Sequence, residues 1–138
     1  MTNYLFVYGS LRHQQENHHF LQAATYINEG YVQGSLYTLK DASYPAFIPQ
    51  GQRMIKGEIY QVDDADLKLC DTLEEYDPSD LCHSEYLRYP YAIYDQNGHF
   101  LFEAYTYVYN PNLHTNLANL IEENDFVAYL NKVKRCSA

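Results

Sequence analysis

One stretch near the start of the chain gives the clearest indication of the fold: Tyr4-Leu5-Phe6-Val7-Tyr8-Gly9-Ser10-Leu11. Its first five residues form a continuous apolar run with aromatic and β-branched side chains, which is typical of a strand buried on both faces. Glycine and serine are turn residues, so the pair at positions 9 and 10 ends the run. We therefore expect a buried strand over residues 4–8 that opens directly into a turn.

The turn after this strand is a candidate binding site. A turn at a strand end can direct successive backbone N–H groups into one hollow, which binds a carboxylate or an oxyanion without a cationic side chain. Tyr8, Gly9, Ser10 and Leu11 are therefore candidate substrate-binding residues. The same residues also fit a plain strand-ending turn, and the residue pattern leaves both interpretations open.

Further strands are predicted along the chain, where apolar and polar residues alternate between turn signals. They cover residues 30–39, 54–62, 85–94 and 100–109, with a short extended piece at 44–49. Gly34 marks a bulge or a close backbone approach within its strand. Residues 95–98 (DQNG) join the last two strands, because Asn-Gly is a strong hairpin signal.

Helices are predicted where apolar residues recur at helical spacing. They cover one or two turns within residues 17–24, a helix over 65–75, and two short segments in the tail that begin near Leu117 and Phe126. Asp63 or Asp64 caps the second of these. The element order predicts an α+β fold: a small mixed, barrel-like β-sheet of five or six strands with two or three flanking helices. We expect one domain over residues 1–138.

Composition and charge exclude several classes of protein. With 9 Lys+Arg against 18 Asp+Glu, the net charge of −9 argues against a partner that is duplex nucleic acid or an anionic membrane surface. Hydrophobic residues at 46% exclude a disordered chain. No signal segment or membrane-spanning apolar run is present, so a cytoplasmic protein is expected. Cys70, Cys82 and Cys136 lack CxxC spacing, which favours free thiols in a reducing compartment.

Residues 71–75 (DTLEE) supply a candidate catalytic carboxylate. Glu74 lies near the C-terminal end of the predicted helix, on the same side as Leu67 and Leu73. If it faces inward, loss of solvation and the negative end of the helix dipole both raise its pKa. A single carboxylate with a raised pKa can act as a base and then as an acid. A solvated helix end with two acidic residues is the alternative interpretation.

A third patch contains His13, Glu16, His18 and His19. Their spacing roughly suits metal ligands on a helix, but the stretch lacks both HExxH and HxxEH. Solvent-facing histidines are the simpler interpretation, and we predict no metal site here. A metal-dependent protein using His13, Glu16 and His19 is kept as the weakest hypothesis.

Taken together, these segments resemble the γ-glutamylcyclotransferase-like family, in the branch related to γ-glutamylamine cyclotransferase. The matching segments, in order, are residues 8–12 (YGSLR), 17–18 (NH), 34–37 (GSLY), 44–46 (YPA), 57–60 (GEIY), 71–78 (DTLEEYDP), 86–88 (YLR) and 104–107 (AYTY). One short motif is weak evidence. Several ordered matches at fitting spacings, running along the chain up to Tyr109, are strong evidence.

The resemblance implies a small barrel-like fold with a cavity at the end of the first strand. It also implies release of an amine from a small γ-glutamyl substrate with closure of the glutamyl part to 5-oxoproline, a transferase- or lyase-type reaction related to glutathione metabolism. Glu74 matches the catalytic carboxylate of the family, and residues 8–11 match its ligand cradle. No metal or organic cofactor is implied.

One departure from the family is Glu75, which stands where the family has glycine. We expect Glu75 to point to solvent, because adjacent helix residues do not share a face. This departure motivates the alternative function, a non-catalytic small-molecule binding module on the same fold. Tyr107 is expected to close the pocket and hydrogen-bond the substrate, with Tyr37 or Tyr44 in its wall.

Overall fold

The computed structural model describes the backbone of residues 2–137 and the side chains of residues 3–134. Five strands form a closed barrel in the order β1-β5-β2-β6-β7. They are β1 (Thr2–Val7), β2 (Thr25–Gln33), β5 (Met54–Asp63), β6 (Tyr86–Tyr94) and β7 (Phe100–Tyr109). The expected α+β, barrel-like fold is confirmed.

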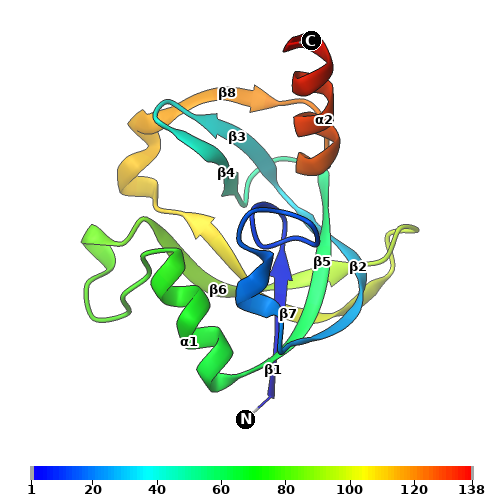
Figure 1. Ribbon diagram of the computed structural model, residues 1–138, viewed down its shortest axis with the longest axis vertical. Helices are drawn as coiled ribbons and strands as arrows, with labels where there is room; N and C mark the ends of the chain where they lie inside the picture. The colour runs from blue at the N-terminus through cyan, green and yellow to red at the C-terminus, as the bar shows by residue number, and fades with distance from the viewer. Residues whose placement is uncertain (1, 138) are drawn as a thin grey trace.

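A second, three-stranded sheet in the order β4-β3-β8 lies beside the barrel (Figure 1). Its strands are β3 (Ser35–Leu39), β4 (Ala42–Ile48) and β8 (Leu117–Ile121). The helices are α1 (Asp64–Leu73) and α2 (Phe126–Ser137), and short 3-10 turns are η1 (His18–Leu21), η2 (Leu81–His83) and η3 (Pro111–Asn116). In Figure 1, α1 flanks the barrel and α2 stands at the opposite end, near β8.

Strand β1 closes the barrel, as its apolar sequence suggests. It pairs antiparallel with β5 from Thr2↔Asp63 to Val7↔Glu58, and parallel with β7 at Leu5↔Tyr105. The side chains of residues 5–8 are all buried, so the end of β1 lies inside the molecule. The turn that follows it is therefore held within the fold.

Gly34 separates two strands where the sequence suggested one strand over residues 30–39. A Cβ atom at this position would lie 2.5 Å from Cε1 of Phe47 and 2.6 Å from the carbonyl oxygen of Ile48. Only glycine permits this close approach. The chain leaves the barrel here, so the two halves of the predicted strand belong to different sheets.

The tail prediction was wrong for residues 117–121, which form β8 and not a helix. Ile121 pairs with Leu36 of β3, and Leu120 pairs with Tyr37. Short apolar runs do not distinguish helix from strand, and here the free edge of β3 decides the outcome. The second tail prediction was correct, because α2 begins at Phe126.

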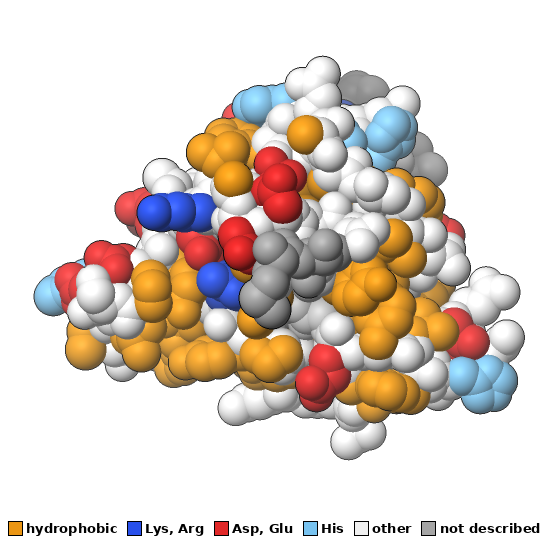
Figure 2. All heavy atoms as spheres, turned by 90° about the horizontal axis from the view of Figure 1, so that it is seen from below, with side chains coloured by type: hydrophobic (Ala, Val, Ile, Leu, Met, Phe, Trp, Pro, Cys, Tyr) orange, Lys and Arg blue, Asp and Glu red, His pale blue; other side chains and the backbone are white. Residues whose placement is uncertain are grey.

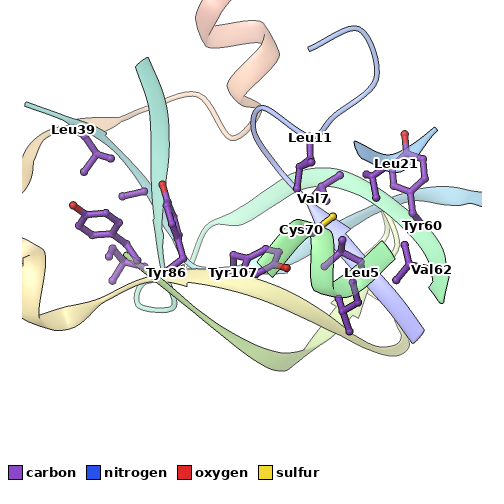
Figure 3. Packing of buried hydrophobic residues seen from close by; sticks show 14 residues of the cluster. Leu5, Val7, Leu11, Leu21, Leu39, Tyr60, Val62, Cys70, Tyr86 and Tyr107 are labelled. Carbon is purple, nitrogen blue, oxygen red and sulfur yellow. The ribbon is translucent and has the colours of Figure 1, made fainter. Parts of the chain in front are cut away.

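The core extends from the barrel to the first helix. Figure 3 shows Tyr107 between Tyr86 and Cys70 of α1, with Leu5 and Val7 of β1 nearby. Each fully buried side chain of this size contributes roughly 1.5–3 kcal/mol to stability. Because β1, β7 and α1 share this core, their ends are fixed relative to one another.

The remaining sequence expectations concern thiols, membranes and the surface. Cys70 and Cys82 are free, whereas the side chain of Cys136 lies outside the described residues. Over the part of the chain that is described, no helix is long and apolar enough to cross a membrane. Figure 2 shows hydrophobic side chains in several groups on one face of the molecule. The tyrosines of the β6–β7 hairpin do not all face the same way: Tyr89 is 42% exposed, whereas Tyr107 is only 3% exposed.

Candidate active site

A pocket lies where β1 ends and brings together the residues singled out from the sequence. Its wall consists of Phe6, Val7, Tyr8, Gly9, Ser10, Leu11, Tyr44, Pro45, Glu74, Tyr86 and Tyr107. It holds about 320 Å³ of empty space, including the open solvent at its mouth. All six predicted site residues line it, and their chemical roles stay predictions. Tyr44 is in the wall, whereas Tyr37 is not.

The turn after β1 contains three consecutive residues that line this pocket and carry backbone N–H donors. Among the described residues, the N–H groups of Gly9, Ser10 and Leu11 donate to no protein acceptor. The turn itself is fixed by other bonds: the N–H of Arg12 donates to the carbonyl of Gly9 at 3.0 Å, and that of Asn17 to the carbonyl of Ser10 at 2.8 Å. Unpaired N–H groups in a partly buried turn are suited to an anionic ligand group.

Arg12 anchors this turn to two other parts of the molecule. Its buried guanidinium pairs with Glu58 of β5 at 3.1 Å and with Asp125 at 2.6 Å. The other oxygen of Glu58 accepts bonds from the His13 N–H at 2.8 Å and the Tyr60 hydroxyl at 2.9 Å. The sequence analysis did not select Arg12, although it ends the YGSLR motif. Its ion partners are distant in the sequence and leave no local signal.

Glu74 is the C-cap residue of α1, and its backbone N–H donates to the carbonyl of Cys70 at 2.9 Å. Burial, and then the charge of Glu85, raise the pKa of its carboxyl group from 4.5 to about 8. Within the described part of the chain, no cationic side chain forms an ion pair with Glu74. The carboxyl group is thus half protonated near neutral to mildly alkaline pH, as a proton-transfer group should be.

Glu75 has a backbone conformation that explains the glycine at this position in the family pattern. It has φ +54° and its side chain is exposed, as expected. The Tyr76 N–H donates to the Asp71 carbonyl at 2.9 Å and the Glu75 N–H to the Thr72 carbonyl at 3.2 Å, which together form a Schellman motif. The helix therefore ends at Leu73, two residues earlier than predicted, and Glu75 lines no part of the pocket.

Two of the pocket tyrosines are fixed through their hydroxyl groups. Tyr8 donates to the backbone carbonyl of Tyr107 at 2.6 Å, and Tyr107 donates to Oδ1 of Asp71 at 2.7 Å. Burial raises the pKa of both hydroxyl groups well above the ordinary value, so both stay protonated. Asp71 also pairs with Arg88, and neither residue was selected from the sequence. The available signals were the position of Arg88 in the YLR match and that of Asp71 at the start of the DTLEEYDP match.

A second carboxylate, that of Glu85, is hydrogen-bonded to a tyrosine of the pocket wall. The Tyr44 hydroxyl donates to Oε2 of Glu85 at 2.6 Å, and the Tyr86 hydroxyl donates to the carbonyl of Pro45 at 2.6 Å. Burial raises the pKa of Glu85, while the Tyr44 bond opposes this shift. The negative charge of Glu85 raises the pKa of Glu74 in turn.

The histidine patch lies at a separate hollow beside η1, away from Glu74. The rings of His13 and His18 meet edge to face at 5.3 Å, and Nδ1 of His18 is 2.9 Å from the carbonyl of Leu11. In the described residues, no group of three or more His, Cys, Asp or Glu side chains could hold a metal ion. The hypothesis of a metal bound by His13, Glu16 and His19 therefore has no donor set in this structure.

The fold and the pocket define a class of protein: a small mixed barrel in which one partly buried carboxyl group and three backbone N–H groups without a protein acceptor belong to residues that line the same cavity. Comparison with known proteins identifies the family within that class. The family described as "Gamma-glutamyl cyclotransferase, AIG2-like" matches residues 5–128. The chain belongs to this family.

Individual relatives agree with this assignment. The "Gamma-L-glutamyl-butirosin B gamma-glutamyl cyclotransferase" of Niallia circulans is 34% identical over 107 residues, which are 77% of this chain and 66% of that protein. The solution structure of YtfP from Escherichia coli is 32% identical with a TM-score of 0.62, covering 90% of this chain and 96% of that one.

The crystal structure of YkqA from Bacillus subtilis has the same fold, with a TM-score of 0.75 at 24% identity over 98% of this chain and 43% of that chain. Matches to curated relatives span part of their length: 24% of the putative gamma-glutamylcyclotransferase YkqA and 59% of YtfP.

Proposed function

We propose that the protein is a γ-glutamyl cyclotransferase that releases an amine or amino acid from a γ-glutamyl compound and forms 5-oxoproline. The observation that carries the proposal is the placement of Glu74, with its raised pKa, in one pocket with the free N–H groups of Gly9, Ser10 and Leu11. Membership of the family supports the same reaction.

The first step is attack by the substrate α-amino group on its own γ-carbonyl carbon. Holding the bent substrate in place makes this closure of a five-membered ring fast, since well-oriented intramolecular reactions reach effective molarities of about 10⁵ M or more. The amino group is protonated at neutral pH, with an ordinary pKa of about 8. Glu74, whose pKa is also about 8, takes that proton nearly without cost. The pKa of an ordinary glutamate lies several units below that of the substrate amino group, and each pKa unit of mismatch costs about 1.4 kcal/mol.

The second step is collapse of the tetrahedral intermediate. Its oxyanion, or the substrate α-carboxylate, is held by the N–H groups of residues 9–11. Protonated Glu74 gives its proton to the leaving amine nitrogen, and the C–N bond breaks. The ring nitrogen, which still carries one proton more than the lactam has, gives that proton to the released amine, so 5-oxoproline and the protonated amine result. Glu74 thereby returns to its starting ionisation state. Tyr107, at the wall of the pocket, shields this exchange from water.

The test is chromatographic detection of 5-oxoproline after incubation with a panel of γ-glutamyl amino acids and amines. The wild type should form product, and Glu74→Gln should lose at least 10²-fold of the rate, the usual contribution of a general acid–base group. Glu103→Gln is the control, because it removes an exposed carboxylate that lies outside the pocket and should keep the activity.

Turnover by Glu74→Gln equal to that of the wild type would refute the assignment of Glu74 as the catalytic residue. If the folded wild type turns over no panel member but is stabilised against heat by one of them, the alternative of a non-catalytic binding module holds.

A further inference from the structure

The Arg88–Asp71 ion pair differs from an ordinary surface pair in its two parallel hydrogen bonds, its contacts with aromatic rings and its burial. Arg88 of β6 holds both carboxylate oxygens of Asp71, with Nε–Oδ1 at 2.7 Å and Nη2–Oδ2 at 3.0 Å. The guanidinium lies 4.6 Å from the ring centroid of Tyr105 and 5.4 Å from that of Tyr76. Both charged side chains are mostly buried, at 17% and 13% exposure. Such a forked pair fixes geometry as well as charge.

The pair controls the only proton of the Tyr107 hydroxyl. That hydroxyl donates to Oδ1 of Asp71 at 2.7 Å, and a phenol has one proton to give. Its oxygen can therefore only accept hydrogen bonds from the pocket that Tyr107 shares with Glu74. Figure 3 shows the Tyr107 ring directed toward α1, the helix that carries Asp71 and ends at Glu74.

The pair places two opposite charges close to the helix end that carries Glu74. The groups that interact electrostatically with Glu74 come from several elements: Tyr8 after β1, Cys70 of α1, Glu85 and Tyr86 around the start of β6, and Tyr107 of β7. Asp71 is three residues before Glu74, and the Arg88 guanidinium is its ion partner. Loss of either partner therefore leaves one uncompensated charge near Glu74.

We propose that Asp71 and Arg88 are a positioning pair for the reaction: they fix the Tyr107 hydroxyl as a hydrogen-bond acceptor for the substrate ammonium group and deny Glu74 a donor. This inference rests on the proposed function and extends it to residues outside the pocket wall. Neither Asp71 nor Arg88 touches the pocket itself, so both act through Tyr107 and through their charges.

The test uses opposite charge changes at the two partners. Asp71→Asn leaves the Arg88 charge without its anionic partner, while the amide oxygen can still accept the Tyr107 proton. The uncompensated cation favours ionised Glu74, so the pKa of Glu74 should fall by about one unit or more. Arg88→Gln leaves Asp71 uncompensated and should raise that pKa. The double variant should lie nearer to the wild type than either single variant. The readouts are ¹³C NMR titration of the Glu74 carboxyl group and the pH profile of kcat/KM.

Controls separate this role from a purely structural one. Lys56→Gln breaks the exposed pair with Glu29, which is 3.2 Å long and outside the pocket, and should leave the Glu74 titration unchanged. Arg88→Lys keeps the charge and should restore most of the wild-type titration. Asp71→Leu removes both oxygens and so also frees the Tyr107 proton, which should lower the Glu74 pKa further than Asp71→Asn does. Tyr107→Phe in the Asp71→Leu background should reverse that further part.

Shifts of the same sign in both single variants, or a lowered melting temperature with an unchanged Glu74 titration, would overturn the proposal. If Asp71→Asn does not fold, the comparison of Arg88→Gln with Arg88→Lys decides it alone. The NMR titration needs no turnover. A wild type that forms no 5-oxoproline therefore refutes the proposed function and still leaves the effect of the pair on Glu74 and Tyr107 measurable.

Discussion

One oxygen of Asp125 serves two structures at once: it accepts a bond from the Arg12 guanidinium at 2.6 Å and another from the backbone N–H of Val127 at 2.9 Å. The second bond caps the start of α2, and the first reaches the residue that follows the pocket turn. The C-terminal helix and the candidate ligand cradle are therefore joined through a single carboxylate.

We predict that Asp125→Asn destabilises the protein by about 2 kcal/mol or more, because it leaves the buried Arg12 with one anionic partner in place of two. Asparagine is as good a helix cap as aspartate, so the substitution tests the ion pair and spares the cap. Urea unfolding measures the effect. Glu29→Gln, which removes an exposed carboxylate, should change stability by less than about 1 kcal/mol. Equal effects of the two variants would contradict the prediction.

Glu75→Gly should stabilise the protein by roughly 0.5–1 kcal/mol, since glycine adopts φ +54° without the cost that a side chain brings. Glu75→Ala removes the same charge but keeps a Cβ atom, so it should bring no comparable gain. Thermal unfolding of both variants separates backbone strain from charge. A larger gain from alanine than from glycine would show that charge repulsion, and not conformation, governs this position.

The stability of the protein should depend on pH through Glu74. Its pKa is about 8 in the folded state against 4.5 ordinarily, so between these values the folded protein holds a proton that the unfolded chain has released. Stability therefore falls as pH rises through this window, with a slope of up to about 1.4 kcal/mol per pH unit. Glu74→Gln should lose this slope and exceed the wild type in stability above pH 8. Urea unfolding from pH 5 to pH 9 measures both, and parallel curves would refute the raised pKa.

Gly9→Ala should impair both ligand binding and stability. A Cβ atom at this position would lie 2.9 Å from Cδ of Pro45, so the turn or the proline has to move. Such overpacking typically costs about 1–3 kcal/mol, and the displaced N–H groups should raise KM at least tenfold. Steady-state kinetics and thermal unfolding report the two effects. Unchanged KM would show that the turn does not hold the substrate.

The sequence predicted those parts of the fold that depend on local patterns. The apolar run of β1, the DQNG hairpin and the Asp63 cap, which accepts a bond from the Asp66 N–H at 2.7 Å, all appear in the structure. The second sheet was missed because its strands β3 and β8 are paired across 81 residues, as the bond between Asn119 and Thr38 shows. No local window contains such a pairing.

The candidate site was predictable where a short local segment contains the functional groups, as in the turn at residues 8–11 and in Glu74 at its helix end. The ion pair that supports these residues was not predictable. Arg88 and Asp71 are 17 residues apart and on different elements, and only the closed barrel brings the guanidinium onto the carboxylate. Ion pairs of this kind carry no periodicity, so a sequence pattern offers no reason to choose one arginine over another.

The parallel contact of β1 with β7 has a consequence for biosynthesis. The Tyr8 hydroxyl and the Tyr107 carbonyl that it binds are 99 residues apart, so the first strand leaves the ribosome long before its last neighbour exists. We expect the nascent chain to stay open, with an apolar edge that chaperones can recognise, until β7 has emerged. Translation arrested just before Phe100 should then yield protease-sensitive chains, and arrest after the tail should yield resistant ones. The pocket is thus assembled only after β7 has been synthesised.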